Sequence, residues 1–174
     1  MPPAMRSSAV DLVYGDGRLS WPGGATRAVC GWGGVRRDKR EGDGASPQGR
    51  FPLVRAFYRP DRIVPPPETS LPLAPLRPNE GWVDDPADPR YNRVVTLPYG
   101  ANHERMWRRD HLYDLVVVIA YNLDPVVPGR GSAIFLHCAS PDLAPTEGCI
   151  AVARDVLLAL FPLLGPLSHI TIRP

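Results

Sequence analysis

Apolar residues in this chain recur in short segments, either alternating with polar residues or as continuous β-branched runs. Segments of this kind, bounded by glycine, proline or aspartate, predict strands. The run at 115–121 (LVVVIAY) has no polar face, so it predicts a central strand that is covered on both sides. The pattern as a whole predicts a mainly β fold. The predicted strands are 9–14, 18–21, 26–30, 53–58, 94–97, 115–121, 133–137 and 169–172.

One segment, 154–164 (RDVLLALFPLL), carries a helical pattern, because its apolar residues fall on one broad face. Pro162 and the Gly-Pro pair that follows limit its length. A weaker helical signal lies at 102–110 (NHERMWRRD), where Asn102 is a favourable N-cap and the arginines come late. The sequence therefore predicts one C-terminal helix and one helical turn within a β domain.

Proline accounts for 22 of the 174 residues, against about 5% in ordinary proteins. The proline-rich stretch at about 59–90 is either an interdomain linker or a long ordered loop. Its apolar residues, among them Trp82, favour an ordered loop that packs on the core and lies as a lid over a site. The glycine-rich, charged stretch at 31–49 predicts a mobile surface loop. Residues 1–174 are accordingly interpreted as a single domain.

The net charge is +2, and the basic tract at 36–40 is interrupted by Asp38, which is too little for a nucleic-acid-binding surface. No stretch is long and apolar enough to cross a bilayer, and residues 1–24 lack the apolar core of a signal peptide. By itself the sequence thus predicts a soluble cytosolic protein. The three cysteines form neither a disulfide framework nor a CxxC zinc pair, and no metal site is predicted.

The candidate chemistry lies at 134–150 (IFLHCASPDLAPTEGCI). An apolar strand ends on His137 and, after a proline-containing loop, Gly148 precedes Cys149. Thiolate is the nucleophilic form of cysteine and a nearby imidazole supplies it, so this pair is typical of a thiol enzyme. The amides of Gly148 and Cys149 are the expected donors to a developing oxyanion. A structural histidine and an inert buried cysteine remain the alternative interpretation.

Polar residues around this pair offer further contacts. Thr146 can hydrogen-bond near the nucleophile, and His111 can line the site. Glu147 can orient a histidine or bind an amine, although a solvated loop carboxylate is the simpler interpretation.

The segment resembles the signature of L,D-transpeptidases, the YkuD-like cysteine enzymes of bacterial cell-wall remodelling. Their motif is a strand-borne histidine, a loop, and then Ser or Thr, a variable residue, Gly, Cys and a small apolar residue. His137 followed by 146–150 (TEGCI) matches it, and 46–51 (SPQGRF) resembles the family's upstream turn with proline, glycine and an aromatic residue. The resemblance covers about 12–172. It implies a YkuD-like mixed β-sandwich or barrel with a helix after the catalytic cysteine.

The resemblance also implies the reaction, which needs no metal or organic cofactor. Cys149, with His137 as base, is expected to be acylated by a donor stem peptide of peptidoglycan, and an amine of meso-diaminopimelate on an acceptor peptide resolves the thioester. The product is a crosslink between two diaminopimelates (3-3 type) or from L-alanine to diaminopimelate (1-3 type). Water or a free D-amino acid as acceptor gives carboxypeptidase or exchange activity. The periplasm is the expected location, and carbapenems are the expected covalent inhibitors.

The short catalytic loop and the segment 106–114 (MWRRDHLYD) resemble a compact proteobacterial branch that is associated with the 1-3 link. Two positions depart from the family motif: many members have His where this chain has Glu147, and Arg or Asn where it has Ala151. Another Cys-His peptidoglycan peptidase or amidase, or an inactive peptidoglycan-binding module, therefore remains an alternative. The substrate-binding residues implied are Met106, Trp107, His111, Thr146 and Glu147.

Overall fold

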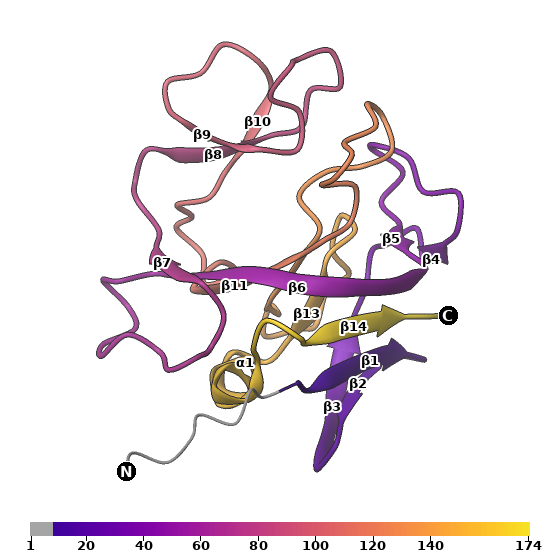
Figure 1. Ribbon diagram of the computed structural model, residues 1–174, viewed down its shortest axis with the longest axis vertical. Helices are drawn as coiled ribbons and strands as arrows, with labels where there is room; N and C mark the ends of the chain where they lie inside the picture. Colours follow the sequence, from indigo (N-terminus) through magenta and orange to yellow (C-terminus); the bar gives the residue numbers. More distant parts are fainter. Residues whose placement is uncertain (1–8) are drawn as a thin grey trace.

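The structure, a computed structural model, describes residues 9–174, and within them eight strands close a mixed barrel (Figure 1). The strands hydrogen-bond in the order β11-β12-β13-β3-β2-β1-β14-β6, and β6 pairs with β11 to complete the ring. The pairs β1–β14 and β12–β13 are parallel, whereas the others in the ring are antiparallel. The predicted mainly β, mixed barrel is confirmed. The ring strands are β1 (Asp11–Gly15), β2 (Arg18–Trp21), β3 (Gly24–Val29), β6 (Gly49–Tyr58), β11 (Leu115–Ile119), β12 (Phe135–Cys138), β13 (Ile150–Val152) and β14 (His169–Ile172).

The barrel interior is filled by apolar side chains from alternate positions of these strands. Helix α1 (Arg154–Leu160) follows β13 and adds the buried Leu157 and Leu160 to this core. The helix continues as a 3-10 turn, η1 (Phe161–Leu163), where Pro162 has no amide hydrogen to extend the α-helical pattern. The predicted C-terminal helix is therefore confirmed, although it is shorter than the pattern suggested.

A small sheet covers the outer face of β11 and β12. Its central strand β8 (Glu80–Val83) is flanked by β9 (Val94–Thr96) and β10 (His103–Arg105), and Figure 1 shows it set apart from the barrel. We call this three-stranded sheet the cap. Trp82 of the cap packs edge-on against Phe135 of β12, with ring centroids 5.0 Å apart. The prediction that Trp82 fixes its loop to the core is thus confirmed; β7 (Leu73–Pro75), earlier in the same proline-rich stretch, pairs with β6.

The helical turn predicted at 102–110 is wrong, because residues within it form β10. Strand β10 pairs antiparallel with β8, and Glu104 lies opposite Trp82. The amide of Met106 extends the pairing by donating to the carbonyl of Glu80. The capping and charge signals of this segment are local, whereas its partner strand lies far earlier in the chain, so tertiary pairing overrides them.

The mobile surface loop predicted at 31–49 is also wrong. Two short strands, β4 (Val35–Arg36) and β5 (Ser46–Pro47), pair within it, and both Lys39 and Ser46 are buried. The hydroxyl of Ser46 donates to the carbonyl of Gly148 at 2.7 Å and accepts from the amide of Gly31 at 2.9 Å. The segment is therefore fastened to the loop that carries the candidate nucleophile.

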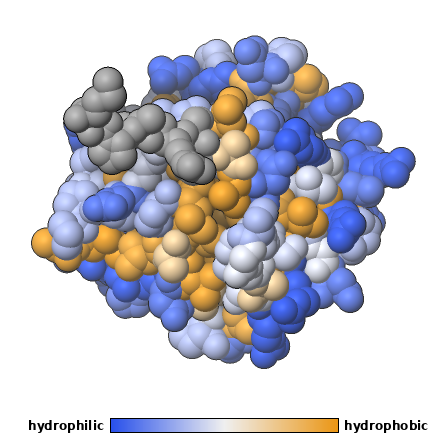
Figure 2. All heavy atoms as spheres, turned by 60° about the horizontal axis from the view of Figure 1, so that its bottom comes forward, coloured by the Kyte–Doolittle hydropathy of each residue, from blue (hydrophilic) through white to orange (hydrophobic). Residues whose placement is uncertain are grey.

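The underside of the molecule in Figure 1 is the face on which α1 lies. Figure 2 shows a strip of apolar side chains there, flanked by hydrophilic ones. Leu163 and Leu167, which follow α1, are among the exposed large apolar residues of the protein. Within residues 9–174 no helix has the length and hydrophobicity that a membrane span requires.

Candidate active site

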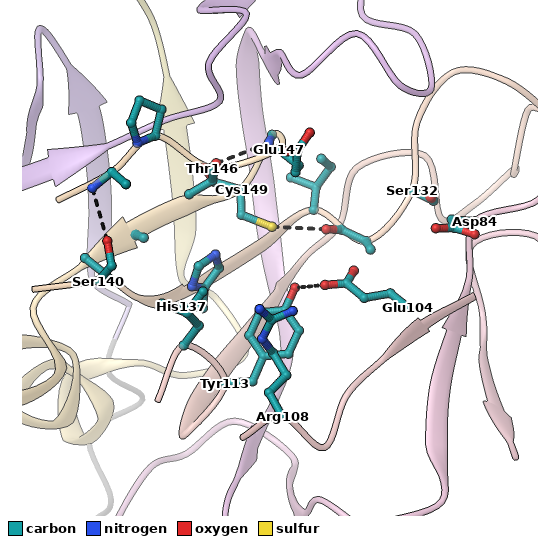
Figure 3. Close-up of a pocket in the computed structure, with 18 of the residues that line it drawn as sticks. Asp84, Glu104, Arg108, Tyr113, Ser132, His137, Ser140, Thr146, Glu147 and Cys149 are labelled. Atoms are coloured by element: carbon teal, nitrogen blue, oxygen red, sulfur yellow. Dashed lines mark hydrogen bonds between the residues drawn. The ribbon is translucent and has the colours of Figure 1, made fainter. Parts of the chain in front are cut away.

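A cavity of about 610 Å³ lies beside the segment 134–150, between the barrel and the cap (Figure 3). Its walls come from β12, the loop that leads into β13, the segment 39–42 and the edge of the cap. Both predicted catalytic side chains, His137 and Cys149, line it. The other titratable residues on its walls are Lys39, Glu41, Asp84, Glu104, Arg108, Tyr113 and Glu147.

Strand register explains why these two side chains share the cavity. Leu136 pairs with Ile150 and His137 with Ala151 in the parallel β12–β13 ladder. This register brings Cys149 beside Phe135, and Phe135 and His137 lie on the same face of β12 because side chains alternate along a strand. Cys149 and His137 therefore both project from the outer face of the barrel. Cys138 points the opposite way, into the barrel core.

The sulfur of Cys149 is held by two backbone groups. The thiol donates to the carbonyl of Ala133 at 3.1 Å, and the sulfur accepts from the amide of Phe135 at 3.3 Å. Figure 3 shows the sulfur directed toward that carbonyl. Burial, together with the charge of Glu104, raises the pKa of Cys149 to about 12. The resting cysteine is therefore a neutral, hydrogen-bonded thiol.

The imidazole of His137 presents one protonated and one unprotonated ring nitrogen. Its Nδ1 lies 2.9 Å from the carbonyl of Cys138, so Nδ1 carries the proton and Nε2 has a free lone pair. The ring packs edge-on against Tyr113, with centroids 5.2 Å apart. Burial lowers the pKa of His137 to about 4, so the ring is neutral at pH 7. Among the hydrogen bonds of residues 9–174, none joins His137 to Cys149, because the thiol is engaged by Ala133.

The loop before Cys149 is rigidly bonded. The hydroxyl of Thr146 donates to the carbonyl of Cys149 at 2.6 Å and accepts from the amide of Gly148 at 3.1 Å. Gly148 has φ +146, and a Cβ there would lie 2.8 Å from the carbonyl of Ala45, so only glycine fits. Glu147 is exposed, and its carboxylate accepts a hydrogen bond from the indole of Trp32 at 2.9 Å.

Three residues implied as substrate-binding do not line the cavity. Met106 is buried in the apolar cluster under the cap. Trp107 stacks on the guanidinium of Arg59, whose central carbon lies 3.7 Å from the ring centroid. His111 is exposed and bonds to the carboxylate of Asp114 at 2.8 Å. Of the five residues, Thr146 and Glu147 alone line the cavity.

Sequence reasoning missed other residues that shape the site. The hydroxyl of Tyr113 donates to the carboxylate of Glu104, and burial raises the pKa of Glu104. Burial also raises the pKa values of Glu41 and Asp84 in the same wall. The cationic side chains are already paired, Lys39 with Asp43 and Arg108 with Asp110. Nothing local marks these residues, because they meet only through the fold.

A third missed group is the buried side chain of Asn92, whose Oδ1 accepts from the amide of Ala133 at 3.0 Å. Asn92 has positive φ, which asparagine adopts more often than most residues, but the sequence does not show which asparagine does so. Its partner Ala133 lies in a distant loop. As for metals, residues 9–174 contain no group of three or more His, Cys, Asp or Glu side chains that could hold an ion.

Comparison with known proteins identifies a family. A family model described as the L,D-transpeptidase catalytic domain (YkuD) matches residues 7–172. Among solved structures, the chain is similar to the helical cell shape determining protein Pgp2 from Campylobacter jejuni, with a TM-score of 0.48 and 15% sequence identity, over 95% of this chain and 47% of that one. The chain thus spans about half the length of Pgp2. No curated protein matches the sequence.

Proposed function

The chain belongs to the L,D-transpeptidase family, whose YkuD catalytic domain spans residues 7–172, and on that premise we propose that it is an active peptidoglycan L,D-transpeptidase. The observation that carries the proposal is the β12–β13 register, which presents Cys149 and His137 on one face in one cavity. A module that had only to bind peptidoglycan would not need an unprotonated imidazole nitrogen beside a thiol.

The first half-reaction acylates the enzyme. The thiol of Cys149 turns from the carbonyl of Ala133 and gives its proton to Nε2 of His137, while the sulfur attacks an amide carbonyl of a donor stem peptide. The amide of Cys149 is the proposed oxyanion donor; that of Gly148 joins it once its bond to Thr146 opens. The carbon–nitrogen bond then breaks, His137 protonates the departing amine, and a thioester remains.

The second half-reaction forms the crosslink. An amine of meso-diaminopimelate on the acceptor peptide attacks the thioester carbon and loses a proton to His137, and the sulfur leaves and regains a proton as Cys149 thiol. The cavity favours a cationic acceptor, because its walls carry four carboxylates, whereas its two cations are already paired. The carboxylates are Glu41, Asp84, Glu104 and Glu147.

The finer reaction is a further part of the proposal. The family resemblance of the short catalytic loop supports a 1-3 crosslink from L-alanine to diaminopimelate over the 3-3 type. Water as the acceptor gives carboxypeptidase activity, and a free D-amino acid gives exchange. We also propose that the protein acts in the periplasm, where the family's substrate lies; cell fractionation that finds it only in the cytoplasm would contradict this.

The decisive experiment treats purified sacculi with the protein and identifies the muropeptides by mass spectrometry. We expect new crosslinked dimers with the wild-type protein and none with Cys149→Ala. Cys138→Ala is the matched control, because Cys138 lies on the same ladder but faces the barrel core, and it should retain product formation.

A carbapenem should add its mass to the protein at Cys149, and peptide mapping locates the adduct. Hydrolysis without crosslinks would support the Cys-His peptidase alternative. A folded protein that gives neither products nor an adduct would support the inactive binding module.

A further inference from the structure

The carbonyl that accepts the hydrogen bond of the Cys149 thiol belongs to Ala133, whose backbone amide is hydrogen-bonded as well. Ala133 has φ +53, a left-handed conformation that is uncommon for alanine. Its amide donates to Oδ1 of Asn92 at 3.0 Å, and its carbonyl accepts from Cys149 at 3.1 Å. Because such a conformation persists only where the surroundings impose it, the orientation of this carbonyl depends on what holds the amide.

Both polar atoms of the Asn92 side chain, Oδ1 and Nδ2, form hydrogen bonds that fix its orientation. Its Oδ1 also accepts from the indole of Trp82 at 2.8 Å. Its Nδ2 donates to the carbonyl of Asn122 at 2.7 Å and to that of Tyr121 at 3.3 Å. Two donors facing Oδ1 and two acceptors facing Nδ2 define which way the amide is turned. With 1% of its surface exposed, Asn92 therefore forms a rigid link between the cap and Ala133.

We propose that Asn92 is a positioning residue that holds the Ala133 carbonyl as a latch for the resting Cys149 thiol. The latch keeps the sulfur turned away from Nε2 of His137 until a donor peptide enters the cavity and the thiol turns to the imidazole. This inference rests on the proposed role of Cys149 as the nucleophile. It assigns to a residue between β8 and β9 a function in the chemistry, through Ala133, without contact with the substrate.

The latch makes a spectroscopic prediction for the wild-type protein. The thiol of Cys149 lies 3.1 Å from its acceptor, whereas those of Cys30 and Cys138 lie 3.5 Å and 4.0 Å from theirs. Because a hydrogen bond lowers the S–H stretching frequency, the Raman band lost in Cys149→Ala should be the lowest of the three. If that band lies at or above the others, the resting latch does not exist.

The variant test compares Asn92→Gly with Asn122→Gly. Both asparagines have positive φ, which glycine tolerates. The side chain of Asn122 bonds to Val127 and Gly131 and not to Ala133, so it is the matched control. Each protein is treated with iodoacetamide, and peptide mapping gives the modification rates of Cys149 and of Cys138. Cys138 is buried in the barrel core, so its rate reports global opening.

We expect Asn92→Gly to raise the ratio of Cys149 to Cys138 modification roughly five- to tenfold, as loss of one net hydrogen bond allows. The rise of the rate with pH should also move to lower pH. Asn122→Gly should leave both the ratio and the pH profile unchanged. An unchanged ratio in Asn92→Gly, or an equal rise in both variants, would overturn the latch.

If Asn92→Gly does not fold, the Raman measurement decides alone. Neither readout needs turnover, so a failed latch and a failed transpeptidase assay are separate results.

Discussion

The two faces of strand β12 contact different kinds of side chain. Leu136 and Cys138 enter the barrel interior, where the surrounding side chains are almost all apolar. Phe135 and His137 enter the space under the cap, where side-chain hydrogen bonds and buried charges accompany the apolar contacts. Since the pleat separates neighbours on one strand, stability and chemistry can be changed independently at adjacent positions.

The largest effect should come from the barrel face. Leu136→Ala removes a fully buried side chain from the interior, and we expect the free energy of unfolding to fall by about 2–5 kcal/mol. Urea unfolding followed by circular dichroism measures it. Thr96→Ala, at an exposed position of the cap, is the control, with an expected change below about 0.5 kcal/mol. Equal losses in the two variants would erase the contrast between barrel and cap.

The next largest effect on stability should come from the buried ion pairs of Asp114, just before β11. The carboxylate of Asp114 is fully buried and bonds to Arg62 at 2.8 Å and to Arg154 at 2.9 Å. Asp114→Ala should cost about 3 kcal/mol at pH 7, because partly buried arginines lose their partner. Asp142→Ala, whose carboxylate bonds to Ser140 on an exposed loop, should cost little.

The pH dependence of that loss has a definite sign. Burial alone would raise the pKa of Asp114, but hydrogen bonds from Arg62 and His111 outweigh it and hold the pKa below its ordinary value. The stabilisation is therefore present above the unfolded-state pKa and is lost as pH falls through the folded-state value. Urea unfolding at pH 7 and pH 3 should show that the free energies of unfolding of the wild-type protein and Asp114→Ala become more similar in acid. A difference that grows toward acid would contradict this.

The smallest effect should appear in the cavity wall, with the opposite sign. Burial raises the pKa of Glu104, so its contribution to stability is full below the unfolded-state pKa and is lost as pH rises through the folded-state value. Glu104→Gln removes the free-energy cost of ionising a buried carboxyl group and keeps an acceptor for the hydroxyl of Tyr113. We expect a gain of about 1 kcal/mol at pH 8 and none at pH 4 by urea unfolding. The exposed Glu68→Gln is the control, and a loss at pH 8 would contradict the prediction.

The strands of the barrel were largely predictable, because the patterns that mark them lie within short stretches of sequence. Alternation and β-branched runs mark most of the ring strands, and a broad apolar face marks α1. The register was not predictable, since the residues at 134–150 do not reveal that β12 and β13 run parallel. The sequence therefore identifies His137 and Cys149 as a candidate pair, whereas their common face follows only from the pairing.

The cap was poorly predictable because distant partners determine it. Strand β10 forms on β8 although its own sequence favours a helical turn. The positions of Met106, Trp107 and His111 follow from the apolar cluster, Arg59 and Asp114, respectively. Asn92 and Ala133 both have positive φ, and the hydrogen bond that joins them links segments far apart in the sequence. Such residues carry no periodic signal.

Strand β14 lies between β1 and β6, and both of those strands come from the first third of the chain. Until β14 has been synthesised, these two strands leave open edges in the sheet, so a nascent chain cannot complete the ring. Contacts between residues so far apart slow folding, so the ring is expected to close only after translation has passed β14.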